Sequence, residues 1–288
     1  APDGRVLVTH DVEQAGVIAR GPDGQDRELA WLDWSLIADI SADGRTILFT
    51  ETGEGGGPGY SVYVRAVDGS PAVRLGEGHA LRFSPDGKQV LAQIHPTTEQ
   101  RLVVYPTGTG EAKVLNVGGL KSRNAIWMPD GQHIVMDASA EGQDSRIYIL
   151  DTRGGAPRAV APSGFGLIDI SPDGRRLIVR GPDRKFSLMA IAGGEAREVP
   201  GLEGGDLVAL WGPDAHWIYV QKGFGPPPTR IVRHELETGR QEPWRDLIPS
   251  DAVGVKAVYW LRLSRDGTSQ AYGYSRKLST LYLVEGLR

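Results

Sequence analysis

Short apolar runs recur at a regular interval along the chain, and each follows a turn of nearly constant sequence. The runs are Val6–Val8, Ile47–Phe49, Val90–Ala92, Ile134–Met136, Leu177–Val179 and Ile218–Val220. Since apolar runs of this length between turn residues are typical of buried strands, we predict that each forms the innermost strand of a sheet. A second strand rich in β-branched and aromatic residues follows each run, and two more strands lead to the next turn. We find no 3.6-residue apolar periodicity, so the pattern predicts an all-β protein.

The turn between the units reads Phe-Ser-Pro-Asp-Gly-Lys in its clearest copy, at residues 83–88. Proline presets φ, aspartate accepts hydrogen bonds from backbone amides, and glycine tolerates positive φ, so the turn residues are structural. The turn aspartates are spaced by 40, 43, 44, 43, 41 and 52 residues; they are Asp3, Asp43, Asp86, Asp130, Asp173, Asp214 and Asp266. This period predicts a β-propeller of four-stranded antiparallel blades.

The number of blades is decided by how the last turn is used. The repeats cover residues 1–43, 44–86, 87–130, 131–173, 174–214 and 215–266, with a partial repeat at 267–288. We predict one propeller domain over residues 1–288, with seven blades favoured and the closing blade incomplete. A blade built from both chain ends would protect the exposed sheet edges of an open ring. Six blades with an appended hairpin is the alternative, and we interpret the chain as a fragment of a longer one.

The repeat resembles the TolB-type propeller, because a Ser-Pro-Asp-Gly-Lys turn followed by an apolar strand recurs over essentially the whole chain. Three further stretches, residues 29–35, 53–64 together with 68–78, and 281–287, resemble the C-terminal propeller region of bacterial eukaryotic-like serine/threonine protein kinases. That resemblance implies an accessory sensor or interaction domain beyond a membrane-spanning segment. The chain has no Val-Ala-Ile-Lys strand, His-Arg-Asp or Asp-Phe-Gly motif, so kinase activity is not assigned to it.

Composition narrows the classes of function. The net charge is −4, so a nucleic-acid-binding surface is not expected, and there is no cysteine for disulfides or thiolate catalysis. No apolar run is long enough for a membrane helix, so we expect no membrane insertion by this segment. The six histidines form no metal-ligand spacing, and no Gly-x-Ser-x-Gly elbow is present. We therefore predict no catalytic residue, metal or cofactor.

One set of polar positions is a candidate binding site. The residues seven positions beyond the turn aspartates end the apolar runs, and the polar ones are His10, Thr50, Gln93, Asp137, Arg180 and Gln221. If those runs are innermost strands, these side chains surround one mouth of the central channel. Simple exposure at a strand end explains the same polarity, and that alternative remains open.

The function predicted from these observations is a non-catalytic ligand- or protein-binding sensor propeller attached to a bacterial protein kinase. Its partner would be a protein, peptide or small ligand at the channel mouth. We expect the extracytoplasmic side of a membrane-anchored parent, with the cytoplasm as the alternative. Two other functions stay open: the substrate-gating propeller of a prolyl-oligopeptidase-type serine peptidase, and a metal-dependent propeller hydrolase.

Overall fold

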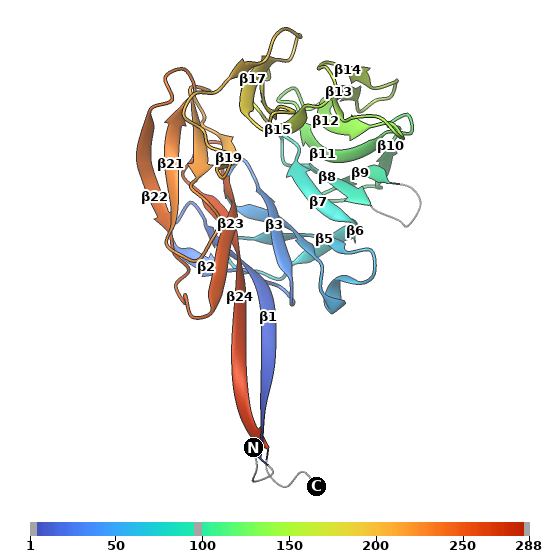
Figure 1. Cartoon of the computed structure of the whole chain (residues 1–288). Helices are drawn as coiled ribbons and strands as arrows, with labels where there is room; N and C mark the ends of the chain where they lie inside the picture. The colour runs from blue at the N-terminus through green and yellow to red at the C-terminus, as the bar shows by residue number, and fades with distance from the viewer. Residues whose placement is uncertain (1–4, 95–99, 285–288) are drawn as a thin grey trace.

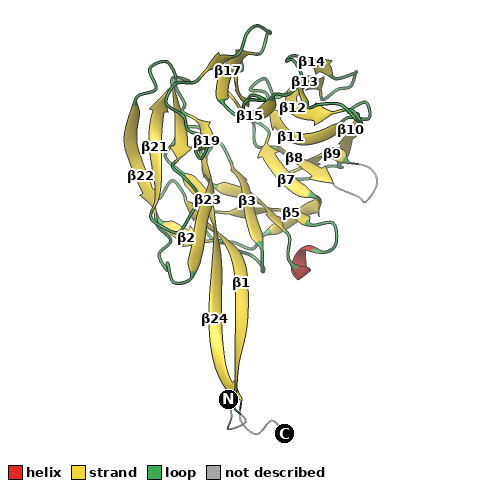
Figure 2. Cartoon of the chain, viewed as in Figure 1, coloured by secondary structure: helices red, strands yellow, loops and turns green. Residues whose placement is uncertain are grey.

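A computed structural model describes residues 5–94 and 100–284, and within them nearly all regular structure is β-strand (Figures 1 and 2). The turn aspartate Asp3 lies outside the described residues. One short 3₁₀ helix, η1 (Glu54–Gly56), interrupts the strands. The described strands form six four-stranded antiparallel sheets arranged as the blades of a propeller. The all-β propeller is therefore confirmed.

Five of the blades are consecutive in sequence. Blade 1 is β3 (Ser35–Ile40), β4 (Thr46–Glu51), β5 (Ser61–Ala66) and β6 (Val73–Glu77), and blade 2 is β7 (His79–Phe83), β8 (Gln89–Ile94), β9 (Arg101–Pro106) and β10 (Lys113–Leu115). Blade 3 is β11 (Lys121–Trp127), β12 (His133–Ser139), β13 (Arg146–Asp151) and β14 (Arg158–Ala159), and blade 4 is β15 (Gly166–Ile170), β16 (Arg176–Arg180), β17 (Phe186–Ala190) and β18 (Arg197–Glu198). Blade 5 is β19 (Leu207–Trp211), β20 (Trp217–Gln221), β21 (Thr229–Glu235) and β22 (Gln241–Leu247).

The sixth, closing blade is built from both ends of the chain. Its sheet order is β2 (Asp26–Glu28), β1 (Val6–Arg20), β24 (Gln270–Val284) and β23 (Val255–Leu263). The closing blade combines both ends of the chain, but it is complete within the described residues, so the prediction of an incomplete seventh blade is wrong and the alternative count of six is right. The strands β1 and β2 near the N-terminus and β23 and β24 near the C-terminus form its single sheet.

The strands β1 and β24 extend beyond the propeller as a two-stranded ribbon (Figure 1). Their pairing runs unbroken from Arg20 with Gln270 to Val6 with Val284. The first nine residues of β1 are exposed, and the next five are buried within the closing blade. The described ends of the chain therefore lie side by side at the ribbon tip.

The innermost strands are not the apolar runs that follow the turns. The strands β3, β7, β11, β15, β19 and β23, which precede the turns, contact one another in a ring around the centre. The runs after the turns form the second strands, such as β4 and β8, so the prediction of innermost position is wrong. Second strands are as deeply buried as the run pattern implies, because both faces of each blade pack on a neighbouring blade.

The hydrophobic core is divided among the blade interfaces. Each of six clusters of buried side chains joins two adjacent blades within the described residues. The cluster with Val17 and Ala271 of the closing blade also contains Ile37 and Phe49 of blade 1. The cluster with Ile231 and Leu247 of blade 5 contains Tyr272 of the closing blade. The ring is thus closed by apolar packing on both sides of the blade that the two ends share.

The repeated turn has the expected hydrogen bonds. In blade 2 the Ser84 hydroxyl donates to Asp86 Oδ1 at 2.7 Å, and the Lys88 amide donates to the same oxygen at 3.1 Å. Gly87 follows with φ of 70°. Hydrogen bonds of this kind hold the carboxyl pKa of Asp43, Asp86, Asp173 and Asp266 below its ordinary value.

Candidate functional site

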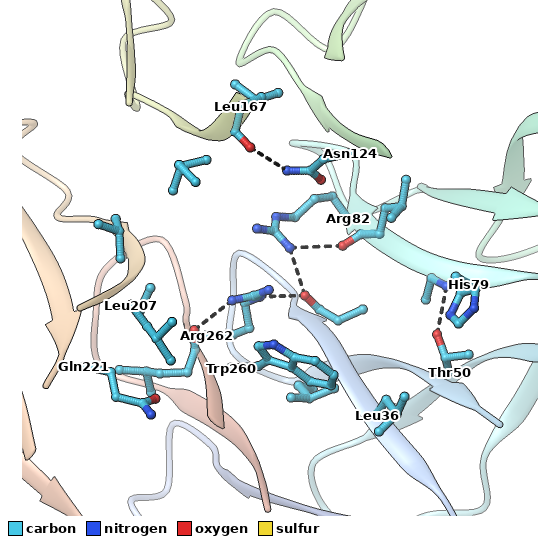
Figure 3. A pocket seen from close by; sticks show the side chains of 18 of the residues that line it. Leu36, Thr50, His79, Arg82, Asn124, Leu167, Leu207, Gln221, Trp260 and Arg262 are labelled. Atoms are coloured by element: carbon cyan, nitrogen blue, oxygen red, sulfur yellow. Dashed lines mark hydrogen bonds between the residues drawn. The ribbon is translucent and has the colours of Figure 1, made fainter. Parts of the chain in front are cut away.

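A cavity of about 420 Å³ lies at the centre of the ring (Figure 3). Residues from the innermost strands of all six blades line it: Leu36, Ile37 and Ala38 of β3, His79 to Arg82 of β7, Asn124 of β11, Leu167 and Ile168 of β15, Leu207 to Ala209 of β19, and Trp260 to Arg262 of β23. Its size falls in the range of pockets that bind small ligands. We take this cavity as the candidate site.

A β-bulge interrupts each innermost strand. In β7 the register shifts between Ala80 and Arg82, and in β23 it shifts between Tyr259 and Arg262. The other four inner strands shift in the same way against their second strands. A bulge re-aims the side chain that follows it. In four of the six strands that side chain is charged: Asp39, Arg82, Asp169 and Arg262.

The two arginines at these positions converge on one acceptor. Arg82 Nη1 donates to the carbonyl oxygen of Ala38 at 3.0 Å, and Arg262 Nε donates to the same oxygen at 2.6 Å. Each also donates through Nη1 to the carbonyl of the residue before it, Leu81 or Leu261. The bonds to Ala38 join the closing blade and blade 2 to blade 1, which lies between them.

Burial and charge act together on these arginines. Burial and, to a smaller extent, the neighbouring positive charge of Arg82 together lower the pKa of Arg262 to about 9, and the negative charges of Asp39 and Asp169 oppose both effects. Arg262 therefore remains protonated at neutral pH, while its charge is less stable than that of an exposed arginine.

The two aspartates join blades through backbone amides. Asp39 Oδ2 accepts from the amide of Phe83 at 2.9 Å, and Asp169 Oδ2 accepts from the amide of Trp211 at 3.2 Å. Burial raises the pKa of both carboxyl groups, and the positive charge of Arg82 opposes the rise. Neither aspartate is among the residues that line the cavity, whereas both arginines are.

The walls of the cavity combine apolar side chains with polar and charged ones. Leu36, Leu207 and Trp260 are drawn in Figure 3 around the arginine pair. Trp260 has φ of 57°, lies within the bulge of β23 and is 45% exposed. Its indole packs edge-on against Tyr259 with ring centroids 4.7 Å apart. An indole held in a left-handed backbone conformation beside a cavity is an unusual use of a bulky residue.

A cation–π contact and an ion pair contribute to the lining beside blades 4 and 5. The guanidinium of Arg180 lies over the Phe186 ring, 5.2 Å from its centroid. Lys222 Nζ pairs with Asp206 at 2.7 Å, and the Asp206 carboxylate is almost completely buried. Arg180, Phe186 and Asp206 line the cavity.

Five of the six predicted polar residues lie at the ends of second strands, and four of these five, all but Arg180, bond to the next blade. Thr50 Oγ1 accepts from the amide of Ala80, Gln93 donates to the carbonyl of Ser122, and Gln221 donates to the carbonyl of Val258. Thr50, Arg180 and Gln221 line the cavity as well. A ligand-binding role for these residues stays a prediction, and their common geometry is that of an interblade connection.

Asp137 and Arg180, two charged members of the predicted set on adjacent blades, do not bond to each other and have other partners. Asp137 accepts from the Ser145 hydroxyl and from the Leu167 amide. Burial raises the pKa of Asp137 to about 6, and the Leu167 hydrogen bond and Arg123 oppose the rise. Arg180 donates to the carbonyls of Arg184 and Gly204 at 3.0 and 3.1 Å.

His10 does not lie in the predicted ring. It is on the third strand of the closing blade, in the exposed part of the ribbon, paired with Thr280. The seventh position beyond Asp266 is Gly273 on β24, which takes the second-strand place in that blade. The placement of His10 at the channel mouth is therefore wrong, because the first apolar run belongs to a third strand.

Sequence reasoning missed the charged residues of the inner strands. Asp39, Arg82, Asp169 and Arg262 each lie four residues before a turn aspartate. The signal in the sequence that could have identified these residues was a charged residue directly before the apolar residue that enters the turn.

Among the described residues, no group of three or more His, Cys, Asp or Glu side chains is placed to hold a metal ion. None of the helical structure described there is long and apolar enough to cross a bilayer.

Comparison with known proteins supports the fold, and no family model matches the chain. The putative TolB of Agrobacterium tumefaciens superposes with a TM-score of 0.66 over 92% of this chain and 99% of that chain, at 17% identity. An oligogalacturonate lyase of Vibrio parahaemolyticus has a TM-score of 0.56 at 15% identity, covering 91% of this chain and 77% of that one. A prolyl endopeptidase has a TM-score of 0.54 at 15% identity, covering 95% of this chain and 53% of that one. At these identities the likeness shows a TolB-like propeller fold and nothing finer.

Two curated proteins match parts of the sequence. An uncharacterized peptidase of Bacillus subtilis, YuxL, is 27% identical over 106 residues, which are 34% of this chain and 16% of that protein. Tricorn protease homolog 1 of Streptomyces coelicolor is 27% identical over 203 residues, 65% of this chain and 18% of that protein. The chain thus matches less than a fifth of the length of these larger proteins.

Proposed function

We propose that this chain is a non-catalytic binding propeller that serves a larger protein and takes its ligand in the central cavity. The observation that carries this proposal is the cavity itself, because all six innermost strands contribute to it. Apolar walls with a few convergent polar groups are typical of a binding pocket. The partial coverage of its curated relatives fits an accessory part of a longer chain.

A cavity-filling variant tests this function. Ala209 lines the cavity from β19, so Ala209→Phe should block it, whereas Ala156→Phe places the same ring at an exposed site. Titration calorimetry with a library of short peptides should detect ligands of the wild type and of Ala156→Phe that Ala209→Phe no longer binds. Mass spectrometry should recover these peptides unchanged. Cleavage of a peptide by the purified chain would contradict a non-catalytic role.

For the parent protein we propose a membrane-anchored bacterial serine/threonine kinase, with the propeller on the extracytoplasmic side. The resemblance of residues 29–35, 53–64 together with 68–78, and 281–287 supports this assignment. The ribbon of β1 and β24 would then hold the propeller away from its anchor. Kinase motifs encoded upstream of Ala1 are expected; their absence from the full-length gene would reject the kinase.

The membrane side is tested separately. Because this chain has no cysteine, Glu111→Cys creates the single exposed thiol of the propeller, and full-length protein without the substitution is the control for cysteines elsewhere. In whole cells producing the full-length protein, a membrane-impermeant maleimide should label this thiol if the propeller is extracytoplasmic. Labelling only after lysis would place it in the cytoplasm.

A substrate-gating propeller of a prolyl-oligopeptidase-type peptidase is the second candidate. The matches to two peptidases and to a prolyl endopeptidase favour it. In that case the gene would continue beyond Arg288 into an α/β-hydrolase region with a Gly-x-Ser-x-Gly elbow. The downstream sequence therefore distinguishes this parent from the kinase.

A further inference from the structure

We propose that the central cavity is a carboxylate-binding site, in which Arg82 and Arg262 hold the carboxylate of a ligand whose body is apolar. The proposal rests on the function proposed above, that the cavity binds a ligand, and specifies the chemistry of that ligand. It follows from the free donors of the two arginines, from the placement of charge around them and from the walls of the cavity.

The free donors are on the guanidinium groups. Arg82 uses Nη1 for its two described hydrogen bonds, and Arg262 uses Nε and Nη1. In the part of the chain that the structure describes, neither Nη2 has a hydrogen-bond acceptor. A guanidinium presents five N–H donors in a planar fork that matches the two oxygens of a carboxylate. Both forks belong to residues that line the cavity.

The backbone fixes where these forks point. Both arginines donate to the single carbonyl of Ala38, so their guanidinium groups are held next to each other. Two arginine side chains with one shared acceptor have less freedom than exposed ones, and a ligand therefore orders them at little further entropic cost. The bulges of β7 and β23 set this convergence.

The distribution of charge favours an anion on the cavity side. Asp39 and Asp169 compensate the arginine charges at long range, but they do not line the cavity, and the carboxylate that does line it, Asp206, is paired with Lys222. The positive charge of Arg82 contributes to the lowered pKa of Arg262, since two adjacent cations repel each other. An anion between the two guanidinium groups would relieve this repulsion. Because Asp39 and Asp169 already offset much of the arginine charge, a second negative charge on the ligand would have no partner, and this favours a singly charged carboxylate over a doubly charged phosphate.

The remaining lining selects the body of the ligand. Leu36, Leu167, Leu207 and Trp260 surround the arginine pair in Figure 3. Burial of apolar ligand surface against these side chains adds affinity in proportion to its area. An apolar chain that ends in a carboxylate fits such a cavity. It can be the free C-terminus of a peptide with hydrophobic last residues or a simple alkyl acid.

Titration calorimetry with three probes tests the proposal on the full chain. The probes are N-acetyl-Leu-Leu as the free acid, the same dipeptide as its C-terminal amide, and octanoate. The free acid should bind at least tenfold more tightly than the amide, because the amide cannot occupy both arginine forks as an anion. Octanoate binding as tightly as the dipeptide would identify an alkyl acid as the source of the carboxylate, and weaker binding would identify a peptide.

Charge variants locate the site. Arg82→Gln and Arg262→Gln should each weaken binding of the free acid at least tenfold and leave the amide unaffected. Arg175→Gln removes an exposed positive charge away from the cavity and should change neither affinity. Arg262→Lys keeps the charge without the fork and should bind the acid more weakly than the wild type. Thermal unfolding confirms that each variant is folded, and the comparison of acid with amide on the wild type needs no variant.

Three outcomes distinguish failure of the carboxylate site from failure of the proposed ligand-binding function of the cavity. Equal binding of acid and amide overturns the carboxylate site. Binding of other library peptides that Ala209→Phe abolishes, with no binding of the three probes, also overturns it but leaves a binding cavity. If no ligand distinguishes the wild type from Ala209→Phe, both proposals fail.

Discussion

The side-chain amide of Gln221 donates a hydrogen bond to the backbone carbonyl of Val258 at 3.0 Å, which connects blade 5 to the closing blade. The same amide nitrogen donates to Gly223 at 3.0 Å. Thr50 and Gln93 occupy the equivalent strand ends and also bond to the next blade: Gln93 donates to the carbonyl of Ser122, and Thr50 accepts from the amide of Ala80. A polar residue at this strand end therefore has a structural role in the ring. If the position were polar only because it faced solvent, no hydrogen bond to the next blade would be needed.

Removal of this connection should weaken the closure of the ring. Gln221 is 1% exposed, so Gln221→Ala leaves buried polar groups without their partner. A lost hydrogen bond of this kind costs about 1–3 kcal/mol in the free energy of unfolding. Urea denaturation should show this loss. Gln89→Ala, at an exposed position of β8, should change stability by less than about 0.5 kcal/mol. Equal effects of the two variants would contradict an interblade role.

Much of the fold follows from the sequence because the turn is chemically demanding. The Ser-Pro-Asp-Gly sequence specifies a tight turn, and its period specifies a blade, so the architecture could be derived without tertiary information. The blade count could not. The Pro-Asp-Gly at the start of the chain counts in the sequence pattern as the start of a blade of its own, which leaves residues 267–288 as a partial seventh unit, although the strand after it, β1, is the third strand of the closing blade.

The site was harder to predict for a related reason. Burial on both faces identifies an internal strand, but it does not separate the first strand of a blade from the second. Arg82 and Arg262 reach the cavity because bulges redirect the inner strands, and the register shift of a bulge depends on the partner strand. The polar ring was found as a pattern, and its contacts with the next blade required coordinates.

The buried carboxyl of Asp137 should give the stability a distinctive pH dependence. Burial raises the pKa of this group to about 6 in the folded state, above its ordinary value near 4. The folded state therefore binds the proton more tightly, and the contribution of Asp137 to stability falls as pH rises from about 4 to above 6. Asp137→Asn should remove the part of this dependence that Asp137 contributes and raise the free energy of unfolding at pH 8 by about 1–3 kcal/mol. The exposed Asp144→Asn should do neither.

The turn aspartates act in the opposite direction at lower pH. The lowered pKa of Asp43, Asp86, Asp173 and Asp266 means that their stabilising effect is present above about pH 4 and lost as pH falls through the folded-state pKa. Urea denaturation of Asp137→Asn between pH 3 and 8 isolates this second effect. We expect stability to fall only at the acidic end; a fall between pH 4 and 6 would assign that range to another group.

Ala215 is a place where the turn departs from its own consensus. It occupies the glycine position of the blade 5 turn with φ of 59°, where Gly87 of blade 2 has φ of 70°. A residue with a Cβ atom in this conformation costs about 1–2 kcal/mol, partly offset by the greater chain entropy of glycine. Ala215→Gly should therefore stabilise the protein by up to about 1 kcal/mol. Gly87→Ala is the matched reverse change, because a Cβ there meets nothing within 4 Å and only backbone strain remains. Urea denaturation of both variants should give opposite signs, and equal signs would show that contacts outweigh the backbone.

Gly16 tests how closely the two ends of the chain pack in the closing blade. It pairs with Tyr274 across β1 and β24, and a Cβ at Gly16 would lie 2.5 Å from the tyrosine ring. The Tyr274 hydroxyl donates to Glu28 Oε2 at 2.8 Å, which keeps the ring over the glycine. Overpacking of this kind costs about 1–3 kcal/mol, so Gly16→Ala should lower the free energy of unfolding by that amount in urea denaturation. Gly108→Ala, where the added Cβ has no neighbour within 4 Å, should be close to neutral.

The pairing of Gly16 with the tyrosine predicts a non-additive rescue. Tyr274→Leu removes the ring that the new Cβ meets, together with its hydrogen bond to Glu28, and should be destabilising alone. In the double variant Gly16→Ala/Tyr274→Leu the clash is absent, so the loss should be smaller than the sum of the single losses by about 1 kcal/mol or more. Additive losses would mean that the ring moves aside at no cost. The closing blade would then be held by its backbone ladder between β1 and β24, with the aromatic ring contributing little.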